Sequence, residues 1–172
     1  QIFTPDEPID KWSDTLFERF SREGYSTGVY FDSERRRQQF DNGVDHYGWS
    51  YDIEDLLDFI SDNKDDNFCI FNLYRGTHLP YVLKYSRKSW GRSKDELMDK
   101  LRHGGEEGID EVKYRYERSI EHFSEWYLRA IIDRLKDEDI LEETAIIITG
   151  DHGEHWGKRM DKQENIGLFD LH

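Results

Sequence analysis

The stretch AIIITGDHGEHWGKR, residues 145–159, decides how this chain is interpreted. Its first five residues are apolar or β-branched and predict a buried strand, which glycine, acidic and histidine residues follow at once. Such a strand would hold a carboxylate and an imidazole on a rigid support. Because both groups are ligands of divalent cations, Asp151 and His152 are candidate metal ligands. The alternative is that Asp151 caps a helix and His152 is an ordinary loop residue.

Two ligands do not complete a site for Ca²⁺ or for catalytic Zn²⁺, so we expect further ligands to come from elsewhere.

The residues before this stretch alternate between helical and strand patterns. The predicted elements are a helix from Asp10 to a stop at Gly24, a strand over 25–31, a helix over 52–62, a strand over 68–74, a small surface helix around 94–101, a long helix, and a third strand over 144–149. Residues 40–50 read as a turn-rich, aromatic loop.

The long helix is predicted from one continuous apolar stripe at steps of three or four residues. The stripe consists of Val112, Tyr116, Ile120, Phe123, Tyr127, Ile131 and Leu135. Helices that alternate with strands predict an α/β fold, in which a mostly parallel sheet is sandwiched by helices. In such folds, ligands bind outside the carboxyl ends of the strands.

His78 follows the second predicted strand in RGTHLPY, residues 75–81, at the edge where Asp151 and His152 are also expected. A histidine there can donate a proton to a leaving oxygen or bind an anionic group. The alternative is a structural loop histidine. The sequence therefore predicts a site at the carboxyl edge of the sheet, with His78 as the candidate catalytic residue.

Composition limits the partners of this chain of 172 residues. Its net charge of −14 argues against a nucleic-acid ligand, since phosphates need a basic surface. No apolar stretch is long enough to span a bilayer, and no signal peptide is visible. Apolar residues make up 35% and charged residues 36%, so we expect a thin core and a piece of a larger domain. Oligomeric state and cellular compartment stay open.

ETAIIITGDHGEHWG, residues 143–157, resembles the signature of the sulfatases of the alkaline phosphatase superfamily: a hydrophobic strand, then Thr/Ser-x-Asp-His/Asn-Gly-Glu. Five further segments are similar to other parts of this family and follow in the family's order across nearly the whole chain. They are TLFERFSREGYSTGVYF (15–31), FDNGVDHY (40–47), FCIFNLYRGTHLPY (68–81), YERSIEHFSEWYLRAIIDRL (116–135) and IGLFDLH (166–172).

The resemblance implies that residues 1–172 are part of a single sulfatase-like catalytic domain with an alkaline-phosphatase-like fold, truncated at both ends. Asp151 and His152 would then be metal ligands, and His78 would contact the sulfate and its leaving oxygen. The metal of sulfatases is commonly Ca²⁺, whereas phosphatase and phosphotransferase relatives use Zn²⁺ or Mn²⁺. The implied substrate is a sulfated small molecule or glycan.

The resemblance also implies a nucleophile upstream of the matching segments: a formylglycine made from Cys or Ser in Cys/Ser-x-Pro-x-Arg, or else a Thr or Ser. This chain is therefore expected to hold no nucleophile and to be inactive by itself. Cys69, the single cysteine, lacks the Pro-x-Arg context and lies in a predicted strand.

Three departures separate this chain from the family pattern. Gly76 and Ser124 stand where the family usually has Asp, and Gln163 and Glu164 stand where it often has Lys or His. His155, Lys158 and Lys162 are nearby and are candidate substrate-binding residues. Two alternatives to a sulfatase therefore stay open. One is a phospho- or phosphonoester hydrolase or phosphoglycerol-type transferase of the same superfamily, and the other is a catalytically inactive binding or scaffold domain.

Overall fold

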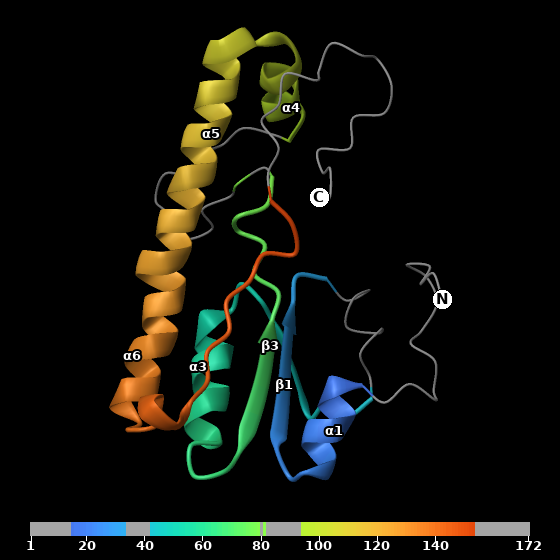
Figure 1. Ribbon diagram of the computed structural model, residues 1–172, viewed down its shortest axis with the longest axis vertical. Helices are drawn as coiled ribbons and strands as arrows, with labels where there is room; N and C mark the ends of the chain where they lie inside the picture. The colour runs from blue at the N-terminus through green and yellow to red at the C-terminus, as the bar shows by residue number, and fades with distance from the viewer. Residues whose placement is uncertain (1–14, 34–41, 80, 82–93, 154–172) are drawn as a thin grey trace.

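A three-stranded parallel sheet with helices on both faces forms the lower half of the molecule, and two packed helices form the upper half (Figure 1). The computed structural model describes residues 15–33, 42–79, 81 and 94–153, with side chains from Leu97 onward in the last range. The strands are β1 (Ser26–Phe31), β2 (His46–Trp49) and β3 (Phe68–Asn72), in the order β2-β1-β3. All pairings are parallel, so the predicted α/β fold with a parallel sheet is confirmed.

The central strand β1 is buried on both faces because one helix covers each face. On one face, Val29 and Phe31 pack against Phe17 of α1 (Leu16–Arg22). On the other face, Tyr30 packs against Leu56 of α3 (Ile53–Asp62) and against neighbouring apolar residues of the same cluster. Side chains alternate between the faces of a strand, so consecutive apolar residues are needed where both faces are covered.

Helix α1 begins with a reciprocal cap. The Glu18 backbone N–H donates to the Thr15 hydroxyl over 3.1 Å, and the Thr15 backbone N–H donates to the Glu18 carboxylate over 2.8 Å. Gly24 ends the helix with a φ of +82°, as the sequence predicted. The predicted start of this helix at Asp10 lies outside the described residues.

The prediction of a loop over 40–50 is wrong for residues 46–49, which form β2 and pair with β1. Gly48 is required here by close packing rather than by a turn. A Cβ at residue 48 would lie 2.2 Å from a carbon of the Tyr30 ring and 2.3 Å from an Asp55 carboxylate oxygen. Close packing against Tyr30 and Asp55 therefore explains why this strand contains a glycine.

A long rod runs through both halves of the molecule (Figure 1). It consists of α5 (Gly105–His122), the π-helical turn η1 (Phe123–Leu128) and α6 (Arg129–Asp137). The predicted stripe is buried at Val112, Tyr127 and Leu135, but Ile120 is 39% exposed. Ser119, one residue earlier, is buried instead. The wider π turn shifts which side of the rod faces the core, and a regular stripe cannot anticipate that shift.

The upper half has its own core, in which α4 (Lys94–His103) packs against α5. Leu97 and Leu101 of α4 contact Val112 of α5 and the loop residues Leu79 and Tyr81. The small helix predicted around 94–101 is therefore confirmed. This upper core is separate from the clusters that surround the sheet.

The third predicted strand is wrong for the described structure. After η2 (Leu141–Glu143), residues 144–149 run as an extended trace without strand pairing (Figure 1). Ile146, Ile147 and Ile148 are 41%, 89% and 59% exposed. The residues have the β-branched character of a strand, but a ladder also requires a neighbouring strand edge.

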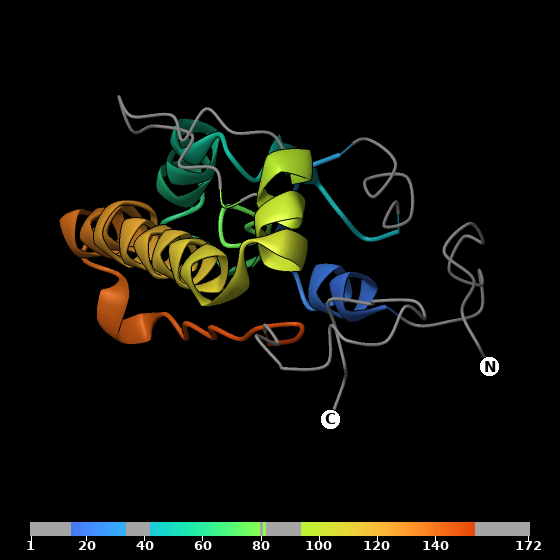
Figure 2. The same ribbon diagram turned by 90° about the horizontal axis from the view of Figure 1, so that it is seen from above.

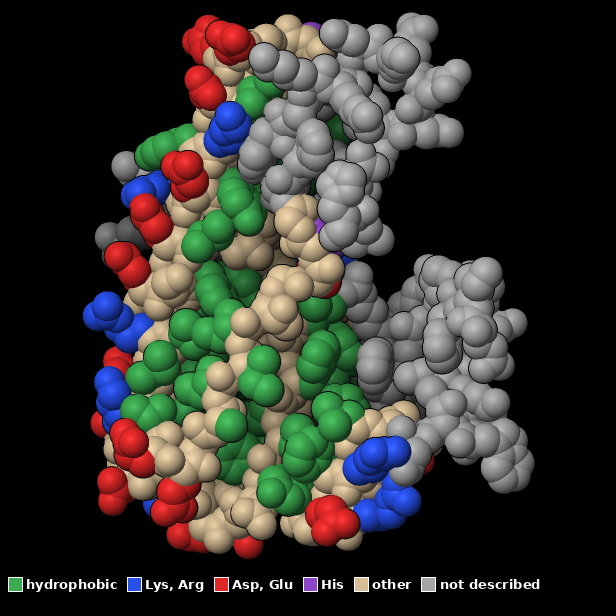
Figure 3. Space-filling model, in the orientation of Figure 1, with side chains coloured by type: hydrophobic (Ala, Val, Ile, Leu, Met, Phe, Trp, Pro, Cys, Tyr) green, Lys and Arg blue, Asp and Glu red, His purple; other side chains and the backbone are tan. Residues whose placement is uncertain are grey.

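This extended segment lies on the side of the molecule that also carries α1, opposite α3 (Figure 2). Figure 3 shows hydrophobic side chains gathered on this side of the molecule, with charged side chains toward its margins. The exposed residues Phe71, Ile146, Ile147 and Ile148 contribute to the apolar surface of the described chain. None of the described helices is long and apolar enough to cross a membrane.

Candidate functional site

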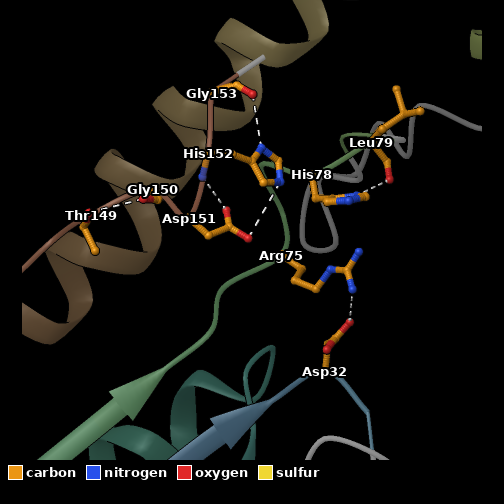
Figure 4. A network of polar contacts seen from close by, with 9 residues as sticks. All are labelled: Asp32, Arg75, His78, Leu79, Thr149, Gly150, Asp151, His152 and Gly153. Atoms are coloured by element: carbon orange, nitrogen blue, oxygen red, sulfur yellow. Dashed lines mark hydrogen bonds and ion pairs between the residues drawn. The ribbon is translucent and has the colours of Figure 1, made fainter. Parts of the chain in front are cut away.

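Polar side chains from three parts of the chain gather beyond the carboxyl ends of β1 and β3 (Figure 4). Asp32 directly follows β1, and Arg75 and His78 belong to the loop after β3. Asp151 and His152 come from the end of the extended segment that follows η2. The structure therefore places the two predicted clusters, His78 and the Asp-His pair, at the same end of the sheet.

The loop after β3 is fixed to the long rod by Tyr74. The Tyr74 ring lies 4.9 Å from the ring of Phe123 and 4.7 Å from the ring of Tyr127, measured between centroids. The Leu73 backbone N–H also donates to the Tyr30 carbonyl over 2.9 Å, which continues the β1–β3 ladder beyond the strand. Residues 75–79 therefore start from a well-anchored position.

Gly76 replaces the Asp that the family resemblance led us to expect, and the structure gives a steric reason. A Cβ at residue 76 would lie 2.3 Å from the Tyr74 hydroxyl oxygen and 2.4 Å from the ring carbon that carries it. Gly76 does not take a positive φ, so packing rather than backbone conformation requires the glycine. With Tyr74 in this place, no aspartate fits at residue 76.

His78 is held by two contacts with the backbone. Its backbone N–H donates to the Arg75 carbonyl over 3.1 Å, which closes a turn. Its ring Nδ1 lies 2.7 Å from the Leu79 carbonyl oxygen. A carbonyl oxygen only accepts hydrogen bonds, so Nδ1 carries a proton in this contact. In neutral His78 the lone pair is then on Nε2, and in the imidazolium form Nε2 carries the second proton.

Asp151 and His152 contact each other. The His152 backbone N–H donates to one Asp151 carboxylate oxygen over 3.1 Å, and the ring Nε2 lies 3.7 Å from the other oxygen. The ring Nδ1 lies 3.1 Å from the Gly153 carbonyl, so in neutral His152 this contact places the proton on Nδ1 and the lone pair on Nε2. The Asp151 side chain is 76% exposed and that of His152 is 24% exposed.

This pair fits two ligands of one cation. Two atoms that each lie ~2.3–2.6 Å from a Ca²⁺ ion can be no more than about 5 Å apart, and the Nε2–Oδ2 distance of 3.7 Å satisfies that limit. Within the described ranges, however, no three His, Cys, Asp or Glu side chains are grouped so that they could hold a metal ion. Asp151 and His152 can therefore supply part of a metal site but not all of it.

Sequence reasoning missed Asp32 and Arg75, which form an ion pair across the ends of neighbouring strands. Arg75 Nη1 lies 3.2 Å from Asp32 Oδ2, and the two side chains are 32% and 26% exposed. Their positions alone could have revealed them, because Asp32 directly follows GVYF and Arg75 directly follows FCIFNLY. Parallel strands bring such residues to one edge of the sheet.

The structure describes only some of the remaining residues that the sequence singled out. His155, Lys158 and Lys162 lie outside the described residues. Ser124 lies in the π turn and donates its hydroxyl hydrogen to the Ile120 carbonyl over 3.0 Å. Burial raises the pKa of the Cys69 thiol, which disfavours the nucleophilic thiolate.

Comparison with protein-family models gives a match to the family described as Sulfatase over residues 2–167. No curated protein and no solved structure matches the chain. The family match spans the sheet, the loop with His78, the long rod and the Asp151–His152 pair.

Proposed function

Because this chain belongs to the sulfatase family, we propose that its protein hydrolyses a sulfate ester at the carboxyl edge of the sheet. The substrate would be a sulfated small molecule or glycan. The observation that carries the proposal is the Asp151–His152 pair, whose nitrogen and oxygen atoms lie 3.7 Å apart at the end of the sheet that also holds His78. An α/β fold of the alkaline-phosphatase type, which the family implies, forms its ligand sites at such an edge.

The Asp151 carboxylate and His152 Nε2 would hold a divalent cation, which we propose to be Ca²⁺. The remaining ligands would come from outside the described residues. When bound, the cation supplies positive charge that stabilises the developing negative charge of the reacting ester. The hydrogen bond from His152 Nδ1 to the Gly153 carbonyl orients the ring and keeps the Nε2 lone pair available to a metal.

His78 would protonate the alcohol as it leaves. In the imidazolium form, Nδ1–H stays bonded to the Leu79 carbonyl, and Nε2–H is the proton that can be transferred. The turn that His78 closes with Arg75 holds the backbone of His78, so the proton donor has a defined position. His155, Lys158 and Lys162 are proposed to contact the substrate. We propose no residue of this chain as the nucleophile.

Metal analysis of the intact protein tests the binding pair. Wild-type protein equilibrated with Ca²⁺ should retain bound metal after buffer exchange, and Asp151→Ala and His152→Ala should each lower its affinity by at least about tenfold. Asp133→Ala is the matched control, because Asp133 is an exposed aspartate on α6 that pairs with Lys136 at 3.6 Å. Equal metal content in wild type and Asp151→Ala would remove Asp151 from the site.

Turnover of a chromogenic aryl sulfate by the intact, Ca²⁺-loaded protein tests the reaction. We expect hydrolysis that falls by about 10²–10⁴-fold in His78→Ala, the usual range for loss of a proton donor. Hydrolysis of an aryl phosphate in place of the sulfate would favour the phosphoester alternative. Bound metal without turnover of either ester would favour the binding or scaffold domain.

A further inference from the structure

We propose that Arg75 binds the sulfate group of the substrate and that Asp32 positions its guanidinium for this contact. The inference rests on the proposed function in one respect, since it takes sulfate as the anion. Neither residue belongs to the metal-binding pair or to the proton donor described above.

The position of Arg75 is the first reason. Arg75 and His78 stand at the two ends of one turn, because the His78 N–H donates to the Arg75 carbonyl over 3.1 Å. A group that protonates a leaving oxygen must lie beside the ester, so a cation on the same turn lies close to the same ester. Figure 4 shows the guanidinium in the region between His78 and Asp32, beyond the arrowheads of β1 and β3.

Charge is the second reason. The chain carries a net charge of −14, so it repels an anionic substrate unless a local cation offsets that field. In the described parts of the strand-end loops (32–33, 50–52 and 73–79) and in residues 144–153, Arg75 is the one lysine or arginine. Gln163 and Glu164 stand where the resemblance leads us to expect a cation. Arg75 can supply such a charge from the loop after β3.

The geometry of the ion pair is the third reason. Arg75 Nη1 lies 3.2 Å from Asp32 Oδ2, so Asp32 restrains the guanidinium from the neighbouring strand. A guanidinium has five N–H donors in a planar fork, and this contact uses one of its nitrogens. Because the Arg75 and Asp32 side chains are 32% and 26% exposed, the pair contributes little to folding stability, and a ligand oxygen can reach the guanidinium.

Sulfate binding without turnover tests the proposal. The intact protein in Ca²⁺ buffer is titrated with sodium sulfate at constant ionic strength, and affinity is measured by calorimetry. Arg75→Gln should weaken sulfate binding by about 10–100-fold, the range for losing a charged hydrogen bond. Arg75→Lys keeps the charge but loses the fork, so its affinity should be intermediate. Asp32→Asn should weaken sulfate binding by less than Arg75→Gln does, since its amide oxygen can still accept from Arg75 Nη1 but without the charge that helps to hold the guanidinium.

Arg129→Gln is the matched control, because Arg129 is an exposed arginine on α6. It should bind sulfate as the wild type does. If Arg75→Gln does not fold, Arg75→Lys decides the question through its sulfate affinity. The proposal is overturned if Arg75→Gln or Arg75→Lys binds sulfate as tightly as wild type, which would make the pair a structural link between β1 and β3. It is also overturned if the wild type shows no measurable sulfate binding.

Turnover separates this inference from the proposed function. With an aryl sulfate substrate, Arg75→Gln should raise KM by at least about tenfold while Asp32→Asn raises it less. Hydrolysis with an unchanged KM in Arg75→Gln removes Arg75 from the site and leaves the sulfatase proposal standing. Sulfate binding that depends on Arg75, in a protein that hydrolyses no aryl sulfate, removes the proposed function and leaves the anion site standing.

Discussion

At the turn between β3 and His78, the Tyr74 ring occupies the volume that a side chain at residue 76 would need. Tyr74 is itself packed against Phe123 and Tyr127, so it cannot move without disturbing the rod. The ring and the glycine therefore form one unit, and a change at either position affects the loop that carries Arg75 and His78.

Gly76→Ala should destabilise the protein by about 1–3 kcal/mol, because its Cβ would lie within 2.4 Å of two Tyr74 atoms. Urea unfolding measures the loss. Gly153→Ala is the control, since a Cβ at residue 153 meets nothing within 4 Å, and its effect should stay within about 0.5 kcal/mol. Equal stability of the two variants would show that Tyr74 yields to a side chain at residue 76.

Tyr127→Phe should cost about 1–3 kcal/mol, because it leaves the carbonyl of buried Ser50 and the amide of half-buried Asn72 without their partner. The Tyr127 hydroxyl donates to the Ser50 carbonyl over 2.9 Å and accepts from the Asn72 amide over 3.0 Å. Tyr114→Phe is the matched control, because Tyr114 is 50% exposed. Chemical denaturation of both variants gives the comparison. Similar losses in both would mean that the Tyr127 hydroxyl contributes no more than a surface hydroxyl.

The elements are joined by a few polar contacts whose strength depends on pH. Glu138, at the end of α6, accepts from the Ser61 hydroxyl at 2.6 Å and from Lys64 at 2.9 Å. These contacts connect the end of the rod to α3 and to the turn that follows it. The hydrogen bond from Ser61, followed by that from Lys64, lowers the pKa of Glu138 below its usual value of 4.5.

Glu138→Gln should therefore remove a pH-dependent part of the stability. The native state favours the ionised carboxylate, so its contribution is complete above pH 4.5 and is lost as pH falls through the lower native-state pKa. The difference in unfolding free energy between wild type and Glu138→Gln should shrink across that range. Ser61→Ala should reduce the same difference in part, because it removes the first cause of the shift. A difference that stays constant with pH would contradict this assignment.

Across the whole molecule, two cores are held together by one rod. The upper core contains Leu97 of α4 with Val112 of α5, and the cluster beside the sheet contains Leu56 of α3 with Leu135 of α6. The π turn lies between these two parts of the rod. Among the described elements, α4 packs mainly against α5 and not against the sheet, so we expect the upper core to open by itself.

Leu97→Ala should cost about 2–5 kcal/mol and should lower amide hydrogen-exchange protection mainly in α4 and α5. Leu56→Ala should cost a similar amount but lower protection in β1, β3 and α3. Both side chains are buried, at 0% and 2% exposure, whereas the control Leu16→Ala changes a side chain that is 59% exposed. A uniform loss of protection in Leu97→Ala would mean that the molecule opens as one unit.

The amino-acid sequence alone determined the class of fold, β1, β3, α3, α4 and the long rod, because these follow from local patterns of apolar residues. It also identified Asp151 and His152 as candidate metal ligands, because a carboxylate and an imidazole are adjacent there in the chain. Only the tertiary structure decided that residues 46–49 form a strand, that residues 144–149 remain outside the described sheet, and that Ser119 rather than Ile120 is buried. The first two depend on a partner that is distant in the chain, and the third depends on the π turn within the rod. The Asp32–Arg75 pair and the steric need for Gly76 were decided in the same way, since side-chain packing and charge pairing act across the fold.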